Sequence, residues 1–229
     1  MNFEVNLIIE SIPKMLAGLG MTMQLLFISS FFGLCLAVLL LLMRISGRSY
    51  LSFPAFMYIY FFRGTPILVQ IFVIYHGFPQ FEFIRESMFW PILREPYGCA
   101  ILALSLNSAA YVSEILRGGY LGVDRDLHEA GMALGLSKYH RFFFVTAPIA
   151  IRLAIPAYSN DFISMIKATS LASTITLLET TGVARTIVAQ TYAPYEIFIS
   201  AAIIYLVLAW FFQRAFGLFE RYMSRYTKQ

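Results

Sequence analysis

The sequence predicts an all-α, polytopic membrane protein with five transmembrane helices. Hydrophobic residues make up 59% of the 229 residues and charged residues 13%, whereas ordinary soluble domains have roughly 45–50% and 25%. The mean hydropathy is +0.70. The apolar residues are gathered in runs of about 20, which is the length a helix needs to cross a hydrocarbon core of about 30 Å.

The first predicted span runs from Leu19 to Met43 and contains only four polar residues. The segment before it carries Glu4 and Glu10 against Lys14, whereas a cleaved signal peptide begins with a basic region. We therefore expect an uncleaved anchor here. The other predicted spans cover residues 53–75, 97–116, 156–178 and 195–219, and residues 77–96 and 180–194 are expected to be loops or short surface helices.

The second span is interrupted by Arg63-Gly64-Thr65-Pro66. Pro66 removes a backbone donor and Gly64 loosens the chain beside it, so the helix should kink or restart there. We interpret Gly64 and Pro66 as a hinge. Arg63 is expected to extend to the lipid headgroups at the inner surface.

Polar residues of the third and fourth spans recur every three or four positions, which places them on one face of each helix. A charged residue at the bilayer centre costs at least about 2.5 kcal/mol and normally faces a cavity or a partner. We therefore predict that the two faces line a solute path. Their members are Asn107, Tyr111 and Glu114 on the third span, and Asn160, Asp161, Ser164 and Lys167 on the fourth.

Each of these residues also has a structural alternative. Hydrogen bonds between membrane helices, at about 0.6 kcal/mol each, would equally explain Ser164. Glu114 would pair with Arg117 or Arg63 in a structural role. Lys167 either donates to a solute or neutralises Asp161.

Lysine and arginine are distributed unevenly between the ends of the predicted spans. One side has only Lys14, Arg85, Arg94 and Arg185. The other side collects Arg44, Arg48, Arg117, Arg125, Lys138, Arg141, Arg152, Arg214, Arg221, Arg225 and Lys228. Because cytoplasmic loops carry the excess, we expect a periplasmic N-terminus, a cytoplasmic C-terminus and a cytoplasmic loop at residues 120–148. This asymmetry explains the net charge of +4, so no nucleic-acid partner is needed.

The loop at residues 120–148 should fold as a helix, a bend and a second helix. Asp126 followed by Glu129 resembles a capping box, which would start a helix near Leu127. Gly135 is placed to end that helix in a left-handed conformation, and Ser137 would cap the next. Such an element fits either a groove on a soluble protein or the lipid headgroups.

The spacing of this loop resembles the coupling loop of bacterial ATP-binding-cassette (ABC) importer permeases. Its ATPase-coupling positions would be Glu129, Ala130, Gly131, Gly135 and Pro148. The resemblance extends to Arg63-Gly64-Thr65-Pro66 with Val69-Gln70, to Asn107, Ala110-Tyr111, Glu114-Ile115 and Arg117-Gly118-Gly119, and to residues 156–161, 169–176 and 204–205. Together these segments resemble permeases that import histidine, lysine, arginine, ornithine or opines. Two departures are Gly131 in place of alanine and Asp124-Arg125-Asp126-Leu127 in place of proline, glycine and glutamine.

The resemblance implies one transmembrane permease domain over residues 1–229, in a bacterial inner membrane. Its partners would be a second permease subunit, two cytoplasmic ATPases and a periplasmic amino-acid-binding protein. In the branch that it resembles, the second permease is usually a homologous relative that forms a heterodimer rather than a copy of the same chain. ATP and magnesium would be bound by the ATPases, because this chain has no Gly-x-x-x-x-Gly-Lys-[Ser/Thr] stretch.

The sequence gives little support to an enzyme. The three histidines have no metal-site spacing, and Cys35 and Cys99 lie in or beside predicted spans, where a disulfide is not expected. One alternative is a proton-coupled secondary carrier that uses Asp161, although such carriers usually have inverted repeats and none is visible. Another is a membrane scaffold without a solute path.

Overall fold

The computed structural model describes residues 5–224, which form helices joined by short turns, without a β-strand in that range. Four long helical segments can cross a membrane: α1 (Val5–Ile45), α6 (Pro96–Leu121), the segment that contains α9 (Ala147–Thr169), and α11 (Pro194–Ser224). When the bent pair described next is counted as one span, residues 5–224 contain the five spans that the sequence predicts. Glu4, Arg225 and Lys228, used above as sequence signals, lie outside the described residues.

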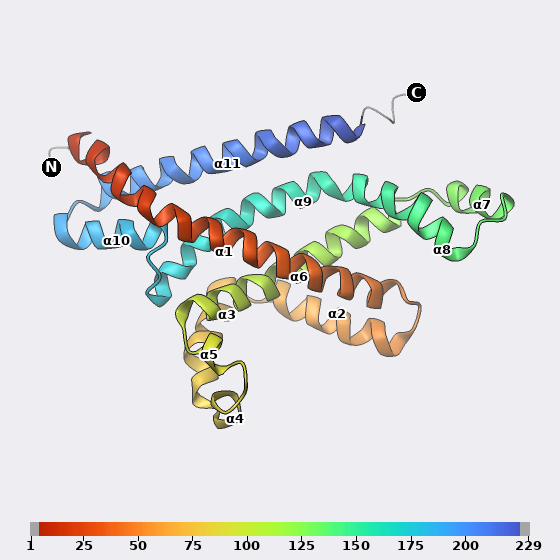
Figure 1. Ribbon diagram of the computed structural model, residues 1–229, viewed down its shortest axis with the longest axis horizontal. Coiled ribbons are helices and arrows are strands. Elements are labelled where there is room, and N and C mark those ends of the chain that lie inside the picture. The colour runs from red at the N-terminus through yellow and green to blue at the C-terminus, as the bar shows by residue number, and fades with distance from the viewer. Residues whose placement is uncertain (1–4, 225–229) are drawn as a thin grey trace.

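The fifth span is the pair α2 (Ser49–Gly64) and α3 (Ile67–Phe72), which are bent by 104° at a short break. The break falls at Thr65 and Pro66, where the sequence predicted it. A π-helical turn (Val73–Gly77), a 3₁₀ turn (Phe78–Gln80) and the short helices α4 (Glu82–Arg85) and α5 (Trp90–Leu93) follow. Figure 1 shows that α4 and α5 extend away from the long helices.

Two predicted spans have wrong boundaries. The described part of the first helix begins at Val5 rather than Leu19, and its N-terminal part packs through Met15 against α10 and α11. The fourth helix is expected at Pro156, but α9 begins at Ala147 and continues through Pro156 before a 3₁₀ segment (Ser170–Ile175). Hydropathy marks the lipid-facing part of a helix and misses the turns that extend beyond it.

For residues 180–194 the sequence analysis expected a loop or a short surface helix, and the structure shows a helix with one buried face. They form α10 (Thr180–Thr191), a helix that lies beside the N-terminal parts of α1 and α11 (Figure 1). Thr180, Gly182, Ala184 and Ile187 on α10 are buried. These residues are small or moderately sized, so α10 packs closely without the long apolar run that hydropathy detects.

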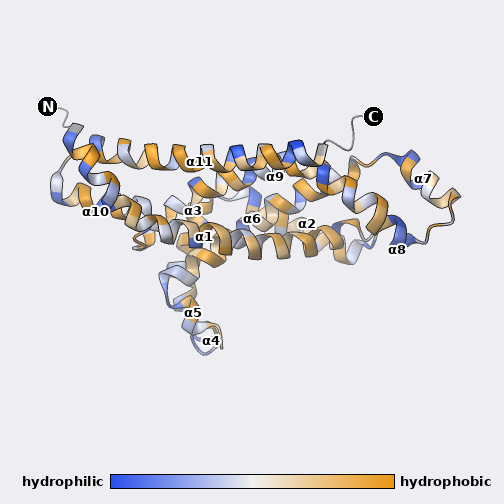
Figure 2. Cartoon of the chain, turned by 45° about the horizontal axis from the view of Figure 1, so that its top comes forward, coloured by the Kyte–Doolittle hydropathy of each residue, from blue (hydrophilic) through white to orange (hydrophobic). Residues whose placement is uncertain are grey.

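Close helix contacts form the core around α6. A Cβ atom on Gly33 of α1 would lie 2.9 Å from the Ser108 side chain, and one on Gly119 would lie 2.4 Å from the Ala150 carbonyl oxygen. Side chains at these two glycines would push α1 and α9 away from α6. Polar residues are interspersed with apolar ones along the inner helices, whereas α1 and α11 carry mostly apolar residues (Figure 2).

The predicted helix-bend-helix element lies at the opposite end of the molecule from α10 (Figure 1). It consists of α7 (Arg125–Ala133) and α8 (Lys138–Arg141). The N-cap is Asp124 rather than the expected Asp126, because Asp124 Oδ1 accepts a hydrogen bond from the Asp126 amide at 3.2 Å. Ser137 caps α8 as predicted.

The bend between α7 and α8 is a Schellman motif. Gly135 has φ +72°, which confirms the predicted left-handed turn. The Leu136 amide donates to the Gly131 carbonyl at 3.0 Å and the Gly135 amide to the Met132 carbonyl at 2.9 Å. These two bonds satisfy carbonyls that the helix end would otherwise leave free.

Candidate functional site

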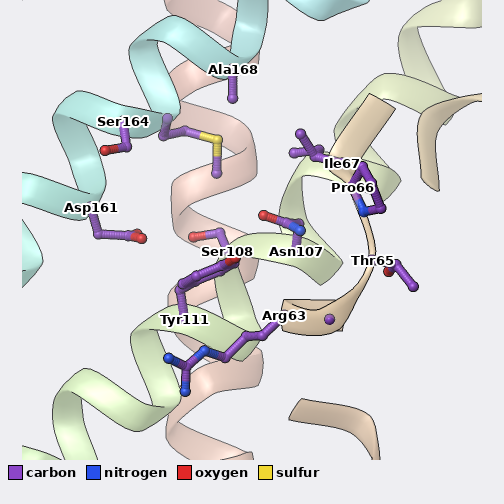
Figure 3. A pocket seen from close by; sticks show the side chains of 12 residues that line it. Arg63, Thr65, Pro66, Ile67, Asn107, Ser108, Tyr111, Asp161, Ser164 and Ala168 are labelled. Carbon is purple, nitrogen blue, oxygen red and sulfur yellow. The ribbon is translucent and has the colours of Figure 1, made fainter. Parts of the chain in front are cut away.

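A cavity of about 580 Å³ lies between the α2–α3 break, α6 and α9 (Figure 3). Its volume falls within the range of about 300–1,000 Å³ that is typical of small-molecule sites. Its polar lining residues are Arg63, Thr65, Asn107, Ser108, Tyr111, Asp161 and Ser164. The cavity therefore presents one cation and one carboxylate among neutral hydrogen-bonding groups.

The structure brings together four of the seven residues predicted to line a solute path, namely Asn107, Tyr111, Asp161 and Ser164. Gly64 and Pro66 of the predicted hinge also line this cavity. Asn160 and Lys167 do not, and both are exposed. The face of α9 at the cavity is instead formed by Asp161, Ser164, Met165 and Ala168, rotated by about one residue from the predicted one.

Asp161 has no charged partner within the described part of the chain. No ion pair joins it to Lys167, so the predicted neutralisation is not formed in this structure. Figure 3 shows the Asp161 carboxylate directed toward the space in front of Ser108 and Asn107. A carboxylate in this position is available to a cationic group in the cavity.

The α2–α3 break is stabilised by side-chain amides. Because Pro66 has no N–H, the Phe62 carbonyl loses its helical partner. Gln70 Nε2 donates to this carbonyl at 2.9 Å and to the Thr65 carbonyl at 3.0 Å. Asn107 Nδ2 donates to the same Phe62 carbonyl at 3.2 Å and to Gln70 Oε1 at 3.0 Å. Asn107 thus joins α6 to the break. This is the structural role, a hydrogen bond between membrane helices, that was the alternative to lining a solute path.

Gln70 is a site residue to which the sequence analysis assigned no role. It is buried and makes the hydrogen bonds that replace those lost at Pro66. The available signal was its position four residues after a proline within an apolar run, where an amide side chain can satisfy freed backbone groups.

A second cavity, of about 410 Å³, adjoins the first and shares Arg63, Gly64 and Tyr111 with it. Glu114 lies here rather than in the first cavity. Arg117 binds it through two nitrogens, with Nε at 2.9 Å from Oε1 and Nη2 at 2.6 Å from Oε2, and Arg44 Nε lies 3.8 Å from Oε1. The predicted alternative of pairing with Arg117 is confirmed.

Arg63, which the sequence analysis kept apart from the solute path, lines both cavities. Its guanidinium carbon lies 5.3 Å from the centre of the Tyr111 ring. Figure 3 shows it running below Tyr111 in the view. The sharp bend after Gly64 ends α2 beside α6, so the last turn of α2 borders both cavities.

A buried carboxylate outside the cavities, Glu179, was missed by the sequence analysis. It caps α10 by accepting the Thr181 and Gly182 amides, each at 2.9 Å, and it accepts the Tyr205 hydroxyl at 2.7 Å. Burial raises the pKa of the Glu179 carboxyl, while these hydrogen bonds act in the opposite direction. Glu179 therefore joins the start of α10 to α11.

The segment α7–α8 exposes apolar side chains. Leu134 is 78% exposed and Met132 55%. Gly131 is buried, and a Cβ there would lie 3.2 Å from Arg141 Cδ, so glycine in place of alanine lets α7 approach the Arg141 side chain. Across residues 5–224 there is no cluster of His, Cys, Asp or Glu that could hold a metal ion.

The relatives found by sequence comparison are permease proteins of transport systems. The octopine transport system permease protein OccM of Rhizobium meliloti is 46% identical over 220 residues, which cover 96% of this chain and 90% of that protein. The histidine/lysine/arginine/ornithine transport system permease protein HisM of Escherichia coli K12 is 36% identical over 212 residues, covering 92% and 89%.

The fold matches a crystal structure of an amino acid ABC transporter with histidines, with a TM-score of 0.86, 33% identity and coverage of 96% of this chain and 99% of that one. A family model described as the inner membrane component of binding-protein-dependent transport systems matches residues 29–225. This protein therefore belongs to the family of inner membrane components of binding-protein-dependent transport systems.

Proposed function

We propose that this chain is the permease subunit of an ATP-driven importer of basic amino acids or opines in a bacterial inner membrane. The observation that carries this proposal is the Asp161 carboxylate, which faces a cavity between three membrane-spanning elements and has no charged partner within residues 5–224. A cationic side chain is the group that such a carboxylate binds best. The named substrates of HisM include lysine, arginine and ornithine, which carry such a group.

The segment α7–α8 is the proposed docking site for a cytoplasmic ATPase. It lies at one end of the long helices, its bend is held by the Gly135 turn, and it exposes Met132 and Leu134 (Figure 1). The coupling residues of this proposal are Glu129, Ala130, Gly131, Gly135 and Pro148. ATP and magnesium belong to the ATPases, and this orientation gives a periplasmic N-terminus and a cytoplasmic C-terminus.

Two permease subunits, two ATPases and a periplasmic binding protein form the proposed complex. The cavity is bounded by α2–α3, α6 and α9 of this chain, and a second permease, homologous to it, closes the remaining side. The family assignment favours this importer over a proton-coupled carrier. An uncoupler added while ATP is held constant separates the two, because only the carrier loses uptake.

The substrate assignment is tested with Asp161→Asn in proteoliposomes that contain the whole complex. We expect ATP-dependent uptake of L-arginine to fall at least tenfold, corresponding to about 1.4 kcal/mol. Asn160→Ala is the matched control, because Asn160 is the neighbouring residue of α9 and lies outside the cavity lining. Equal uptake by wild type and Asp161→Asn would refute the role of Asp161.

The coupling assignment is tested with Gly135→Pro. Proline fixes φ near −65° and cannot adopt the positive φ of Gly135, so α7 and α8 should lose their relative orientation. We expect ATP-dependent uptake to stop while the ATPases keep their basal hydrolysis. Gly47 has a similar φ of +70° outside the segment, and Gly47→Pro provides the comparison for a general effect on folding. Undiminished uptake by Gly135→Pro would exclude this docking mechanism.

A further inference from the structure

Three arginines surround the second cavity, but only two of them have a carboxylate. Arg117 holds Glu114 through two nitrogens, and Arg44 approaches the same carboxylate while donating to Ser52 Oγ at 3.0 Å. Arg63 forms neither a hydrogen bond nor an ion pair with any residue from 5 to 224. Its guanidinium carbon lies 5.3 Å from the centre of the Tyr111 ring.

The exposed Arg63 side chain lines both cavities and makes no direct ion pair within residues 5–224, so its guanidinium is available to an anionic ligand. Such groups are costly in the bilayer and normally face a cavity, where they pair with a partner. The Tyr111 ring holds the guanidinium at the junction of the two cavities. Stacking of this kind leaves the in-plane N–H donors of arginine free for a ligand.

We propose that Arg63 binds the α-carboxylate of the transported amino acid, while Asp161 on the other side of the cavity receives its cationic side chain. The planar fork of arginine matches the two oxygens of a carboxylate. Figure 3 shows Arg63 and Asp161 entering the same cavity from α2 and α9. This inference rests on the proposed function and makes Arg63 a specificity-determining residue.

A lipid phosphate offers similar chemistry to a guanidinium, but the position of Arg63 favours the solute. Asn107, Ser108 and Ser164 line the same cavity, and these groups suit a polar solute better than an acyl chain. The acyl chain that accompanies a lipid headgroup fits better in a third cavity, between α1, α5 and α6, whose lining is almost entirely apolar.

The test compares two ligands that differ only in the carboxylate. L-Arginine and agmatine, which is arginine without its carboxyl group, are bound to the purified complex without the binding protein and measured by equilibrium dialysis. In Arg63→Gln we expect affinity for L-arginine to fall about tenfold to hundredfold, and affinity for agmatine to stay within about twofold. Arg63→Lys keeps the charge without the fork and should give an intermediate affinity for L-arginine.

Arg214→Gln is the matched control. Arg214 also stacks on an aromatic ring, with its guanidinium carbon 5.6 Å from the Trp210 ring centre, but it lines neither cavity. It should leave both affinities unchanged. A general structural effect of Arg63→Gln would weaken L-arginine and agmatine equally, and that result would overturn the inference.

Three further outcomes are distinguishable. If wild type binds both ligands and Arg63→Gln binds L-arginine equally well, the inference fails while the proposed function stands. Loss of co-purified phosphatidylglycerol from Arg63→Gln, with unchanged L-arginine binding, would assign Arg63 to a lipid phosphate and also overturn it. If the wild-type complex binds neither ligand, the substrate class in the proposed function fails, and the inference fails with it.

Discussion

Replacing Glu179 by alanine should destabilise the protein more than any other single substitution of a buried glutamate. The change leaves the Thr181 and Gly182 amides and the Tyr205 hydroxyl without their acceptor. A donor that stays buried and unpaired costs about 1–3 kcal/mol. The Tyr205 hydroxyl keeps Thr181 Oγ1 at 3.0 Å, so we expect a total loss of about 3–5 kcal/mol.

The loss can be measured with a dye that becomes fluorescent on reaction with a thiol. Cys99 is fully buried and Cys35 is exposed, so in a Cys35→Ser background the dye reports the unfolding that uncovers Cys99. For a domain of this size about 1 kcal/mol corresponds to a shift of about 2–4 °C. The apparent Tm of Glu179→Ala should therefore fall by about 10 °C.

Glu196 provides the matched control for this measurement. It is buried in the first turn of α11, and its Oε2 has no hydrogen-bond partner in the described part of the chain. Glu196→Ala should cost no more than about 1 kcal/mol, the contribution of an acidic residue near a helix N-terminus. Equal shifts for the two variants would refute the argument that the cap of α10 depends on the Glu179 hydrogen bonds.

Three other predictions concern buried groups. The pKa of the Glu179 carboxyl is raised in the folded state. The protonated carboxyl therefore contributes fully to stability below the unfolded pKa of about 4.3, and this contribution is lost as pH rises through the folded pKa. The Tm of the wild type should fall relative to that of Glu179→Gln as pH is raised. Gly119→Val should lower Tm by overpacking against the Ala150 carbonyl, at a cost of at least about 1–3 kcal/mol, whereas Gly217→Val, with open space around it, should not. Gln70→Leu should cost about 2–4 kcal/mol because the Thr65 carbonyl loses its amide donor, and unchanged thermal stability would show that the break does not need this amide.

The sequence was sufficient where a local rule determines the structure. Hydrophobic runs located the five spans, Pro66 located the break in the second, and Gly135 and Ser137 determined the bend before α8. Each of these features depends on residues within a few positions of one another. Local chemistry therefore gave the order of the elements and the form of the loop.

The sequence was insufficient where the answer depends on neighbouring helices. It placed Lys167 at the cavity because periodicity gives the residues that share a face, but not the direction in which that face points. It did not place Arg63 at the cavities, because the 104° bend at the end of α2 cannot be read from the sequence. Glu179 was missed because its partner Tyr205 is 26 residues away.

The contacts around the cavity suggest which parts move during transport. The α2–α3 bend is held by amides from Gln70 and Asn107, so a hinge at Gly64 and Pro66 would have to break these bonds. By contrast, one helical segment of 38 residues, Lys138–Ile175, runs from the end of α7–α8 to the cavity and carries Asp161.

An ATPase that displaces α7–α8 would therefore move α9 through a continuous helical segment, in which a π-helical turn (Phe142–Thr146) joins α8 to α9. The tight contact between Gly119 and Ala150 makes the crossing of α6 and α9 the natural pivot for this motion. Arg63 lies on α2, and the hydrogen bond from Asn107 to the Phe62 carbonyl joins α2 to α6. Rotation of α9 about its crossing with α6 would therefore change the distance between Arg63 and Asp161. We expect this change in distance, rather than unfolding of the α2–α3 break, to weaken the binding of the carboxylate by Arg63 and of the cationic side chain by Asp161, and so to release the amino acid.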